Sequence, residues 1–444
     1  MNGFWTTFLP PAIVLSSLVP GLIIFSLREE QVRLRIALNL FAAGLKLVLL
    51  GLMLWGVNRG LDFRFAIDFL PGGGLVLQGD ATSLQFVSLS AVLWLATTIY
   101  AIGYLEDSPL RSRFFGYFSL CVSAAVGLAL AGNLVTFLLF YELLTLATFP
   151  LVVHRGTEQA LRAGRVYLAY TLGGGALLLT GVALLHSLVG SPTFQAGAFG
   201  IIRVVYDVYG VEQVQALGLA LPLLALATAT IIYGSLRALQ QQDLKKRLAY
   251  STTSQVSYIT LGVALMGPIA AVGALAHLVH QGLMKVTLFY CAGNFAETLG
   301  IHRIREMDGV GQRMPLTMTA FTLAALGMIG VPPTAGFISK WYLGYGALEV
   351  GQDWVLLVLV LSGLLNAAYF LPLIYRGWFV APPAEWPHER QLGSGKPWLG
   401  ETHWMLLAPV LFTTVLALLV GVLAGSALSP LTWSELIMNR QFDL

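Results

Sequence analysis

Four ionisable side chains lie inside long apolar stretches of this sequence, where they could carry charge or protons. Glu142 sits near the middle of LVTFLLFYELLTLATFPLVV. Three lysines interrupt other apolar segments: Lys46, Lys285 and Lys340. A charge at the centre of a bilayer costs about 2.5–3.5 kcal/mol on insertion scales, so such residues usually face protein or water and often mark an ion path. We expect Glu142 to carry protons or set the local field, the alternative being a carboxylate that only ties two helices together.

Lys285 shares its apolar segment with other titratable and hydrogen-bonding groups. In HLVHQGLMKVTLF, the residues His277, Gln281 and Lys285 fall at i, i+4 and i+8, so a helix aligns them in one polar stripe. His280 lies about 60° off that stripe. Such a stripe in a lipid-embedded helix is what a proton wire needs. A metal site on the two histidines is not expected, because no third ligand has a suitable spacing.

Lys340 follows a predicted interruption of its span. Pro332 and Pro333 in GVPPTAGFISKWYL remove backbone donors and prevent a continuous helix. Non-helical backbone at membrane depth persists only inside protein or beside water, and a discontinuous span with an ionisable residue is a recurrent feature of transporters. We favour a proton-carrying role over a proline kink with Lys340 snorkelling outward.

Lys46 lies in the middle of LFAAGLKLVLLGLML. Its one polar neighbour at helical spacing is Asn39, at i−7. Two roles for Lys46 stay open on the sequence: a function in ion movement, and an intramembrane pairing with another span or another subunit.

The composition indicates that lipid is the solvent of this chain. Of its 444 residues 57% are hydrophobic and 11% charged, with a mean hydropathy of +0.77, whereas soluble domains carry about 25% charged residues. The net charge of +3 and the scattered basic residues argue against nucleic acid as a partner. Cys121 and Cys291 lie in apolar runs, and no dinucleotide, phosphate-loop, haem or iron–sulfur motif occurs. We therefore expect no cofactor and no redox chemistry in the chain itself.

A span requires ~20 mainly apolar residues, and about twelve segments qualify. They are 8–27, 34–57, 82–104, 114–131, 134–153, 166–189, 214–236, 248–266, 271–294, 315–345, 354–376 and 405–427. A weaker stretch, 194–212, is expected to be a short re-entrant or half helix. Alternate loops are rich in Arg and Lys, which places them in the cytoplasm and both termini on the opposite side of the plasma membrane. The predicted fold is an all-α polytopic membrane protein.

Four motifs occur in order along the chain: FYELLTLATFPLV, QQDLKKRLAYSTTSQVSYI, HLVHQGLMKVTLFYCAGNFAETLGIHRI and GVPPTAGFISKWYL. Together they resemble the antiporter-like membrane subunit family. That family includes the large subunits of multi-subunit (Mrp-type) Na⁺/H⁺ antiporters and the proton-pumping membrane subunits of respiratory complex I. The last two motifs look most like the D subunit of Mrp-type antiporters. The resemblance covers residues from about 80 to about 380.

The resemblance implies two inverted five-helix repeats and identifies site residues. Glu142 corresponds to the glutamate of the family's fifth helix. Lys285 corresponds to the lysine of its H-x-x-x-H-x-x-x-K stripe, with His277 as the first histidine. Gln281 stands at the second histidine position, with His280 beside it, so the histidine relay is interrupted here. Lys340 corresponds to the lysine that follows the second broken helix.

The sequence departs from the family pattern in one region. Before the basic loop at 237–247 the family has three spans, one of them broken and carrying a lysine, whereas here about 50–60 residues are absent around 193–197. The alternation of basic loops independently leaves room for only two full spans between 154–165 and 237–247. We expect Glu142 to lack its usual lysine partner. The expected regions are 1–80 with N-terminal spans and an outer loop, 81–212 as the incomplete first repeat, 213–380 as the second repeat with a broken helix at 330–336, and 381–444 with a cytoplasmic loop and the C-terminal span.

These features predict a membrane subunit of a multi-subunit cation/proton antiporter. Protons move between Lys285, the His277/Gln281 region and Lys340, and Glu142 couples this path electrostatically to a neighbouring subunit. The expected partners are protons, Na⁺ or another monovalent cation, the lipid bilayer and other membrane subunits. Two alternatives stay open: a proton-pumping membrane subunit of an NADH–quinone oxidoreductase or membrane hydrogenase, and a non-transporting scaffold or shortened copy. In each case the chain is expected to be a transport or structural subunit and not itself an enzyme.

Overall fold

The computed structural model describes residues 2–70, 73–105, 108–189, 205–206, 210–388 and 401–442. The chain forms two compact units. Unit 1 comprises Met1–Thr98 and Leu105–Val208, and unit 2 comprises Ile99–Tyr104 and Tyr209–Leu444. Each unit has its own core of packed helices.

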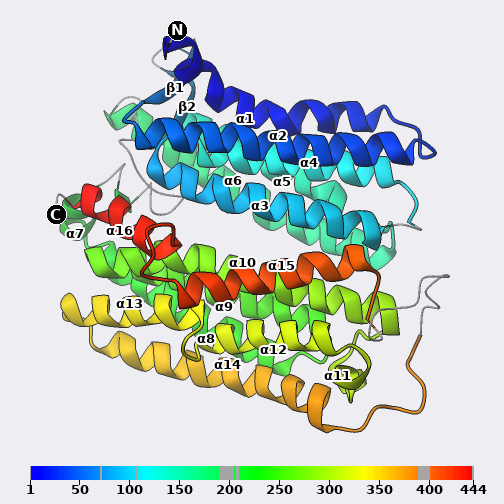
Figure 1. Cartoon of the computed structure of the whole chain (residues 1–444). Coiled ribbons are helices and arrows are strands. Elements are labelled where there is room, and N and C mark those ends of the chain that lie inside the picture. The colour runs from blue at the N-terminus through cyan, green and yellow to red at the C-terminus, as the bar shows by residue number, and fades with distance from the viewer. Residues whose placement is uncertain are drawn as a thin grey trace. The chain divides into compact units, whose positions relative to one another are not determined.

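Unit 1 is a bundle of helices with a β-hairpin in its described part (Figure 1). Its elements are α1 (Asn2–Phe25), α2 (Val32–Asn58), β1 (Phe63–Leu70), β2 (Gly73–Gly79), α3 (Ala81–Tyr104, whose last residues belong to unit 2), α4 (Arg111–Ala129), α5 (Leu134–Val152) and α6 (Glu158–Val189). The helix α1 packs against α2 and α4, α4 against α5, and α5 against α6. Gly21 of α1 lies so close to α4 that an added Cβ would come within 2.8 Å of Ser119 Cβ. Small residues permit this close approach of helices in lipid.

The β-hairpin is a difference from the sequence analysis, which assigns residues 1–80 to spans and an outer loop. The strands β1 and β2 pair antiparallel. The signal was present, because FRFAIDF alternates in polarity with period two and glycines follow it. The hairpin is fixed to the start of α5, where Asn133 Nδ2 donates to Gly74 O at 2.9 Å and Val76 N donates to Thr136 Oγ1 at 2.7 Å.

Unit 2 contains the helices from α7 onward. They are α7 (Val211–Ala216), α8 (Ala220–Gln240), α9 (Leu244–Ala264), α10 (Pro268–Leu299), the 3₁₀ turn η2 (Ile304–Glu306), α11 (Val310–Arg313), α12 (Pro315–Ile329), α13 (Ala335–Glu349), α14 (Trp354–Phe379), α15 (Trp404–Val422) and α16 (Pro430–Gln441). The helix α10 is the centre of this unit, because it packs against α9, α12, α13, α15 and α16. Its glycines make this possible: a Cβ on Gly273 would come within 2.8 Å of the Leu343 backbone nitrogen on α13.

The all-α polytopic fold is confirmed. Nine helices of the described chain are long and apolar enough to cross a membrane: α1, α2, α3, α4, α5, α8, α10, α14 and α15. α12 is a shorter apolar helix, and the other expected segments correspond to α6, α9 and α13. α9 is more polar, since LKKR stands at its start and STTSQ in its middle. The weak stretch 194–212 lies largely outside the described residues, and the expected gap near 193–197 lies wholly outside them.

Candidate functional site

The segment between α12 and α13 interrupts a span of unit 2 (Figure 1). α12 ends at Ile329 and α13 begins at Ala335, with Pro332 and Pro333 between them. Proline has no backbone donor, so the last carbonyls of α12 receive no continuing helical hydrogen bonds. Gly330 closes α12 with φ at +98°, a left-handed conformation that side chains other than glycine rarely adopt.

Lys340 on α13 turns back onto the open end of α12. Its Nζ donates to the carbonyl oxygens of Met328 at 2.8 Å and of Ile329 at 2.9 Å. A helix leaves such carbonyls free at its C-terminus, where its dipole also favours a positive charge. Gly330 makes room for the contact, since a Cβ there would lie 3.1 Å from Lys340 Cδ. The ammonium therefore rests on backbone dipoles and does not snorkel outward.

The opposite end of α12 carries the complementary charge. Glu401, in the loop before α15, accepts hydrogen bonds at Oε1 from Leu316 N at 2.5 Å and Thr317 N at 3.1 Å, and at Oε2 from Thr317 Oγ1 at 2.7 Å. Burial raises the pKa of Glu401 above its ordinary value, although the hydrogen bonds from Thr317 oppose that change. A carboxyl group thus lies at the positive end of α12 and an ammonium at the negative end.

Lys285 on α10 is buried, with 5% of its surface exposed. Its Nζ donates to Leu248 O at 3.3 Å and to Ser251 Oγ, both on α9, and lies 5.9 Å from the centre of the Phe370 ring. Within the described part of the chain, neither Lys285 nor Lys340 has a carboxylate at ion-pair distance. Hydroxyl and carbonyl oxygens therefore hold both amines in place of a fixed counter-ion.

The predicted histidine of the stripe lies next to Lys340. His277 Nδ1 is 2.8 Å from Ser339 Oγ, and Ser339 precedes Lys340 on α13. The Tyr258 ring lies between them, with its centre 5.2 Å from the His277 ring and 5.4 Å from Lys340 Nζ. The structure therefore brings together His277 from α10 and Lys340 from the broken helix.

Within the described part of the chain, several buried polar atoms around these residues make no hydrogen bond of good geometry to protein. They belong to Gln255 and Tyr258 on α9, to His277, His280 and Gln281 on α10, and to Ser362 on α14. Both ring nitrogens of His280 are among them, although His280 is fully buried. Buried polar groups in folded proteins are nearly always hydrogen-bonded, and ordered water supplies the partner where protein does not. A cluster of this kind is therefore where water molecules find several partners at once.

Two residues that the sequence analysis missed connect the lysines along α14. Asn366 Nδ2 donates to Met328 O at 3.2 Å, the same carbonyl that Lys340 binds. The Tyr369 hydroxyl donates to Asn366 Oδ1 and also lies beside Ser251, the partner of Lys285. The i, i+3 spacing of Asn366 and Tyr369 was a weak signal, because single Asn and Tyr residues are common in spans.

Glu142 lies in unit 1 and is therefore described apart from the lysines of unit 2. It is half-buried on α5, and its carboxylate lies directly against Gly175 of α6. Any Cβ at Gly175 would collide with Glu142 Oε1. Among the described residues no lysine pairs with Glu142.

Lys46 is enclosed within unit 1, with none of its surface exposed. Its Nζ donates to Ser17 Oγ on α1 at 2.6 Å and lies 4.8 Å from the centre of the Trp94 ring on α3. The sequence left open whether Lys46 pairs with another span or with another subunit. The structure shows contacts with two neighbouring spans of the same chain, α1 and α3. The partners are a hydroxyl and an aromatic ring.

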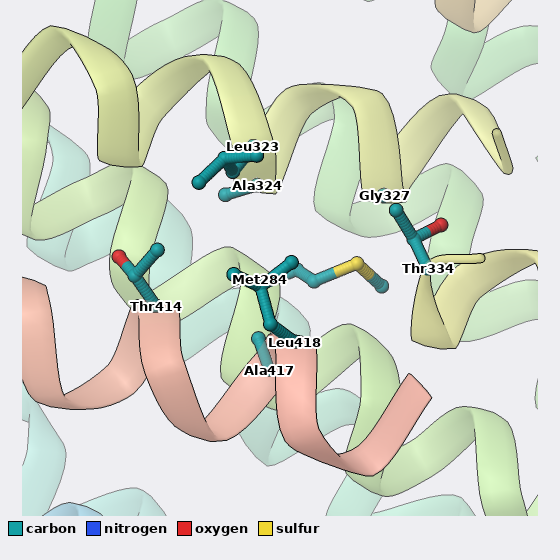
Figure 2. Close-up of a pocket in the computed structure, with 8 residues that line it drawn as sticks. All are labelled: Met284, Leu323, Ala324, Gly327, Thr334, Thr414, Ala417 and Leu418. Carbon is teal, nitrogen blue, oxygen red and sulfur yellow. The ribbon is translucent and has the colours of Figure 1, made fainter. Parts of the chain in front are cut away.

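A small apolar cavity lies behind the break, on the side of Met284, which precedes Lys285 on α10. Figure 2 shows its lining: Met284, Leu323, Ala324, Gly327, Thr334, Thr414, Ala417 and Leu418. The Met284 thioether extends toward Gly327 and Thr334. At about 10 Å³ the space is barely enough for one water, and its lining is apolar apart from Thr334 and Thr414. This cavity is not an ion site, and the described residues contain no group of three or more His, Cys, Asp or Glu that could hold a metal ion.

Comparison with known proteins places these features in a family. A family profile described as NADH:quinone oxidoreductase/Mrp antiporter, TM, matches residues 131–197 and 191–366. NADH-quinone oxidoreductase subunit N of Desulforudis audaxviator is 31% identical over 387 positions, which cover 73% of this chain and 77% of that protein. The D subunit of a Na⁺/H⁺ antiporter from Bacillus subtilis is 24% identical, covering 95% and 94%. A chain in the structure of the Mrp complex from Dietzia sp. has the same fold, with a TM-score of 0.82, 21% identity and 97% of each chain covered.

The lengths of these alignments bear on the segment expected to be absent. An alignment of 387 positions that covers 73% of 444 residues includes about 60 positions with no counterpart in this chain, roughly the length of two to three spans of ~20 residues. The two matches to the family profile meet at residues 191–197. The shortened first repeat itself stays a prediction.

Proposed function

Because this chain belongs to the NADH:quinone oxidoreductase/Mrp antiporter transmembrane family, we propose that it is a membrane subunit of a monovalent cation/proton antiporter complex. It moves protons through unit 2, between Lys285 and Lys340, in exchange for Na⁺ or another monovalent cation. Its own role is transport and not catalysis.

The observation that carries this proposal is the position of the Lys340 ammonium on the free carbonyls of Met328 and Ile329. When Lys340 releases its proton, the amine keeps N–H donors but loses the attraction of a positive charge to the negative end of α12. Losing the proton therefore loosens α13 from the end of α12. A bound proton shifts a conformational equilibrium only if it binds one conformation more tightly than the other. Coupling to a second ion requires the same difference in affinity, because both ions must favour different conformations.

Two polar connections join the lysines. One passes from Lys340 by Ser339 to His277 and continues through the unpartnered groups on α10, where water completes it. The other begins near the Met328 carbonyl that Lys340 binds, and passes by Tyr369 and Ser251 to Lys285. Hydroxyl groups both donate and accept, so each can take a proton on one side and release one on the other. Asn366 holds Tyr369 and the Met328 carbonyl in this arrangement.

We further propose that the chain works beside other membrane subunits in the plasma membrane. Its fold matches a chain of a multi-subunit complex. The basic loops lie on the cytoplasmic side and both termini on the other side, as their Arg and Lys content predicts. In such an assembly, the half-buried Glu142 sets the field felt by a neighbouring subunit.

A second candidate is a proton-pumping membrane subunit of a redox-driven complex. The observation that favours it is the relative from Desulforudis audaxviator, whose name is NADH-quinone oxidoreductase subunit N. In that case electron transfer in partner subunits drives the protons, and proton movement is independent of Na⁺.

The test is Na⁺-dependent proton movement in inverted vesicles that contain the whole assembled complex. Wild type is compared with Lys285→Ala and, as a control, with Lys246→Ala, which removes an exposed lysine at the start of α9. We expect Lys285→Ala to lose at least about tenfold in rate, about 1.4 kcal/mol in barrier, and Lys246→Ala to match wild type. Proton movement that needs electron transfer but not Na⁺ supports the second candidate. If the wild-type complex moves no protons, the scaffold interpretation replaces both.

A further inference from the structure

The buried face of α2 carries a row of polar groups that the proposed transport path does not use. Arg35, Asn39 and Lys46 are each at most 1% exposed. Their spacing places them on one face of the helix. Arg35 lies near the start of α2, and Lys46 lies about 16 Å further along at 1.5 Å per residue. The row therefore reaches from one end of α2 to its middle.

Lys46 has partners in both of its protonation states. The ammonium donates to Ser17 Oγ at 2.6 Å and lies 4.8 Å from the centre of the Trp94 ring, at a distance typical of cation–π attraction. A neutral amine at the same place can accept the Ser17 hydroxyl proton. A proton can thus be gained or lost without moving the surrounding helices.

Among the residues that the structure describes, no carboxylate lies at ion-pair distance from Lys46. The helices α1 and α3 contain no Asp, Glu, His, Lys or Arg. α4 has only Arg111 and Arg113, both in its first turn. Two acids follow α1 in the chain: Glu29 pairs with Arg35 at 3.9 Å, and Glu30 is exposed in the same loop. Since buried charges are normally paired, an amine with no acid beside it is not explained as one half of a structural ion pair.

Three buried serines lie between the lysine and the start of α2: the hydroxyls of Ser17 and Ser123 bond directly to each other, whereas Ser123 meets Ser119 at its backbone carbonyl. Ser17 Oγ is 2.7 Å from Ser123 Oγ on α4, and Ser123 Oγ donates to Ser119 O at 3.0 Å. Ser119 Oγ donates to Asn39 Oδ1 at 3.5 Å, and Asn39 Nδ2 donates to Arg35 O at 2.9 Å. All three serines are at most 1% exposed. We call Ser17, Ser123 and Ser119 the serine file.

We propose that Lys46, Ser17 and Ser123 form a proton-binding site in unit 1 that exchanges protons with the side of the membrane where α2 begins. On release, an N–H bond of the Lys46 ammonium breaks as its proton binds Ser17 Oγ, Ser17 passes its own hydroxyl proton to Ser123, and Ser123 gives its hydroxyl proton to a water molecule, which leaves as hydronium toward the side where α2 begins. Rotation of the hydroxyls restores the file for the return transfer. The ligand is the proton itself, and no other reactant is consumed. The site does not depend on transport by Lys285 and Lys340.

Trp94 offers a direct reporter of this site. The full chain is labelled with fluorotryptophan, placed in lipid nanodiscs and titrated by ¹⁹F NMR between about pH 5 and about pH 10. Trp94→Phe identifies its resonance among those of the ten tryptophans. We expect the Trp94 resonance to move with the titration of one proton in wild type and to stay constant in Lys46→Met and Lys46→Arg, because guanidinium does not titrate. The other tryptophan resonances show whether each variant is folded.

The result that overturns the site is a Trp94 resonance that does not change with pH in wild type, or that changes equally in folded Lys46→Met. The route is tested in liposomes, where pH is changed on one side at a time. We expect Trp94 to follow the side at which α2 begins, and Ser123→Ala to respond at least about tenfold more slowly, about 1.4 kcal/mol in barrier. The matched control is Ser16→Ala, which removes a buried hydroxyl of α1 bonded only within its own helix, to Ile13 O. A Ser123→Ala response as fast as that of Ser16→Ala overturns the serine file as the route.

Discussion

Two lysines within apolar segments of this protein, the half-buried Lys340 and the fully buried Lys46, sit in different surroundings. Lys340 in unit 2 rests on the open end of a broken helix, among buried polar atoms of the described chain that make no hydrogen bond of good geometry to protein. Lys46 in unit 1 lies between unbroken helices, and the groups of its serine file are hydrogen-bonded to one another or to the backbone. A charged residue in a span does not by itself define a path. A path across the unit needs a break and groups that water can join, whereas a closed lysine site can only bind and release.

The largest effect is expected from closing the space that Lys340 occupies. Gly330→Ala puts a methyl group 3.1 Å from Lys340 Cδ and forces a positive φ on alanine, which costs about 1–2 kcal/mol. We expect proton movement in vesicles of the assembled complex to fall at least about tenfold. Gly351→Ala is the control, because Gly351 also has a positive φ, +69°, but has open space around it.

Thermal unfolding of the two glycine variants separates strain from displacement. Both should lose a similar free energy of unfolding, about 1–2 kcal/mol, through the same backbone strain. Equal losses of proton movement in both variants would show that backbone strain alone lowers the rate, and that the position of Lys340 against α12 has no effect.

A smaller effect is expected from the connection along α14. Tyr369→Phe removes the hydroxyl between Asn366 and Ser251, while the His277 connection remains. We expect a loss of about three- to fivefold in proton movement, or roughly 1 kcal/mol in barrier. Tyr375→Phe makes the same change at an exposed position of the same helix and should match wild type. A Tyr369→Phe complex with wild-type rates would leave the histidine connection as the whole route.

Moving Glu142 tests whether unit 1 also conducts. Gly175→Ala pushes the carboxylate of Glu142 out of its place against α6, whereas Gly173→Ala has nothing within 4 Å to displace. If the first repeat is shortened as the sequence predicts, Gly175→Ala should change proton movement by no more than about twofold, under roughly 0.5 kcal/mol. A tenfold loss specific to Gly175→Ala would mean that unit 1 carries the path, and would reverse the comparison between the units.

The smallest effect is expected on the pH dependence of stability, through Glu401 at the start of α12. Burial raises the pKa of Glu401, so the folded protein binds this proton more tightly than the unfolded chain. The resulting stability is present below the ordinary value of 4.5 and is lost as pH rises through the folded pKa. We expect the unfolding temperature to fall over this window in wild type and to fall less in Glu401→Gln. Glu385→Gln, at an exposed position, should keep the wild-type slope, and an unchanged slope in Glu401→Gln would contradict the prediction.

The sequence alone identified the residues whose charge makes them energetically costly in lipid. Lys46, Lys285 and Lys340 stand out because an ion in an apolar span needs a special setting, and the two prolines marked the place where the structure interrupts the span. The helical segments followed from apolar length for the same reason. Family resemblance added the expectation that Lys285 corresponds to the lysine of the family's histidine–lysine stripe, which composition alone does not provide.

The sequence did not predict those hydrogen-bond partners that depend on how the helices cross. Ser251, Tyr369 and Ser17 are inexpensive in a span, so nothing in their local sequence distinguishes them from residues that bond to their own helix. Their importance comes from which helix lies opposite, and that depends on close packing at small residues such as Gly21 and Gly273. The β-hairpin was missed for another reason: the search for long apolar runs gave a short alternating segment no weight.

The most direct test of proton transfer through unit 2 is to replace Lys340 with Met and with Arg in the assembled complex and to measure proton movement in vesicles. Arginine keeps the positive charge at the end of α12 but cannot release its proton under these conditions. We predict that both variants lose proton movement, at least about tenfold, while Lys340→Arg still assembles. Proton movement at the wild-type rate in Lys340→Arg would contradict the account, because a fixed charge would then suffice and no proton would need to leave this residue.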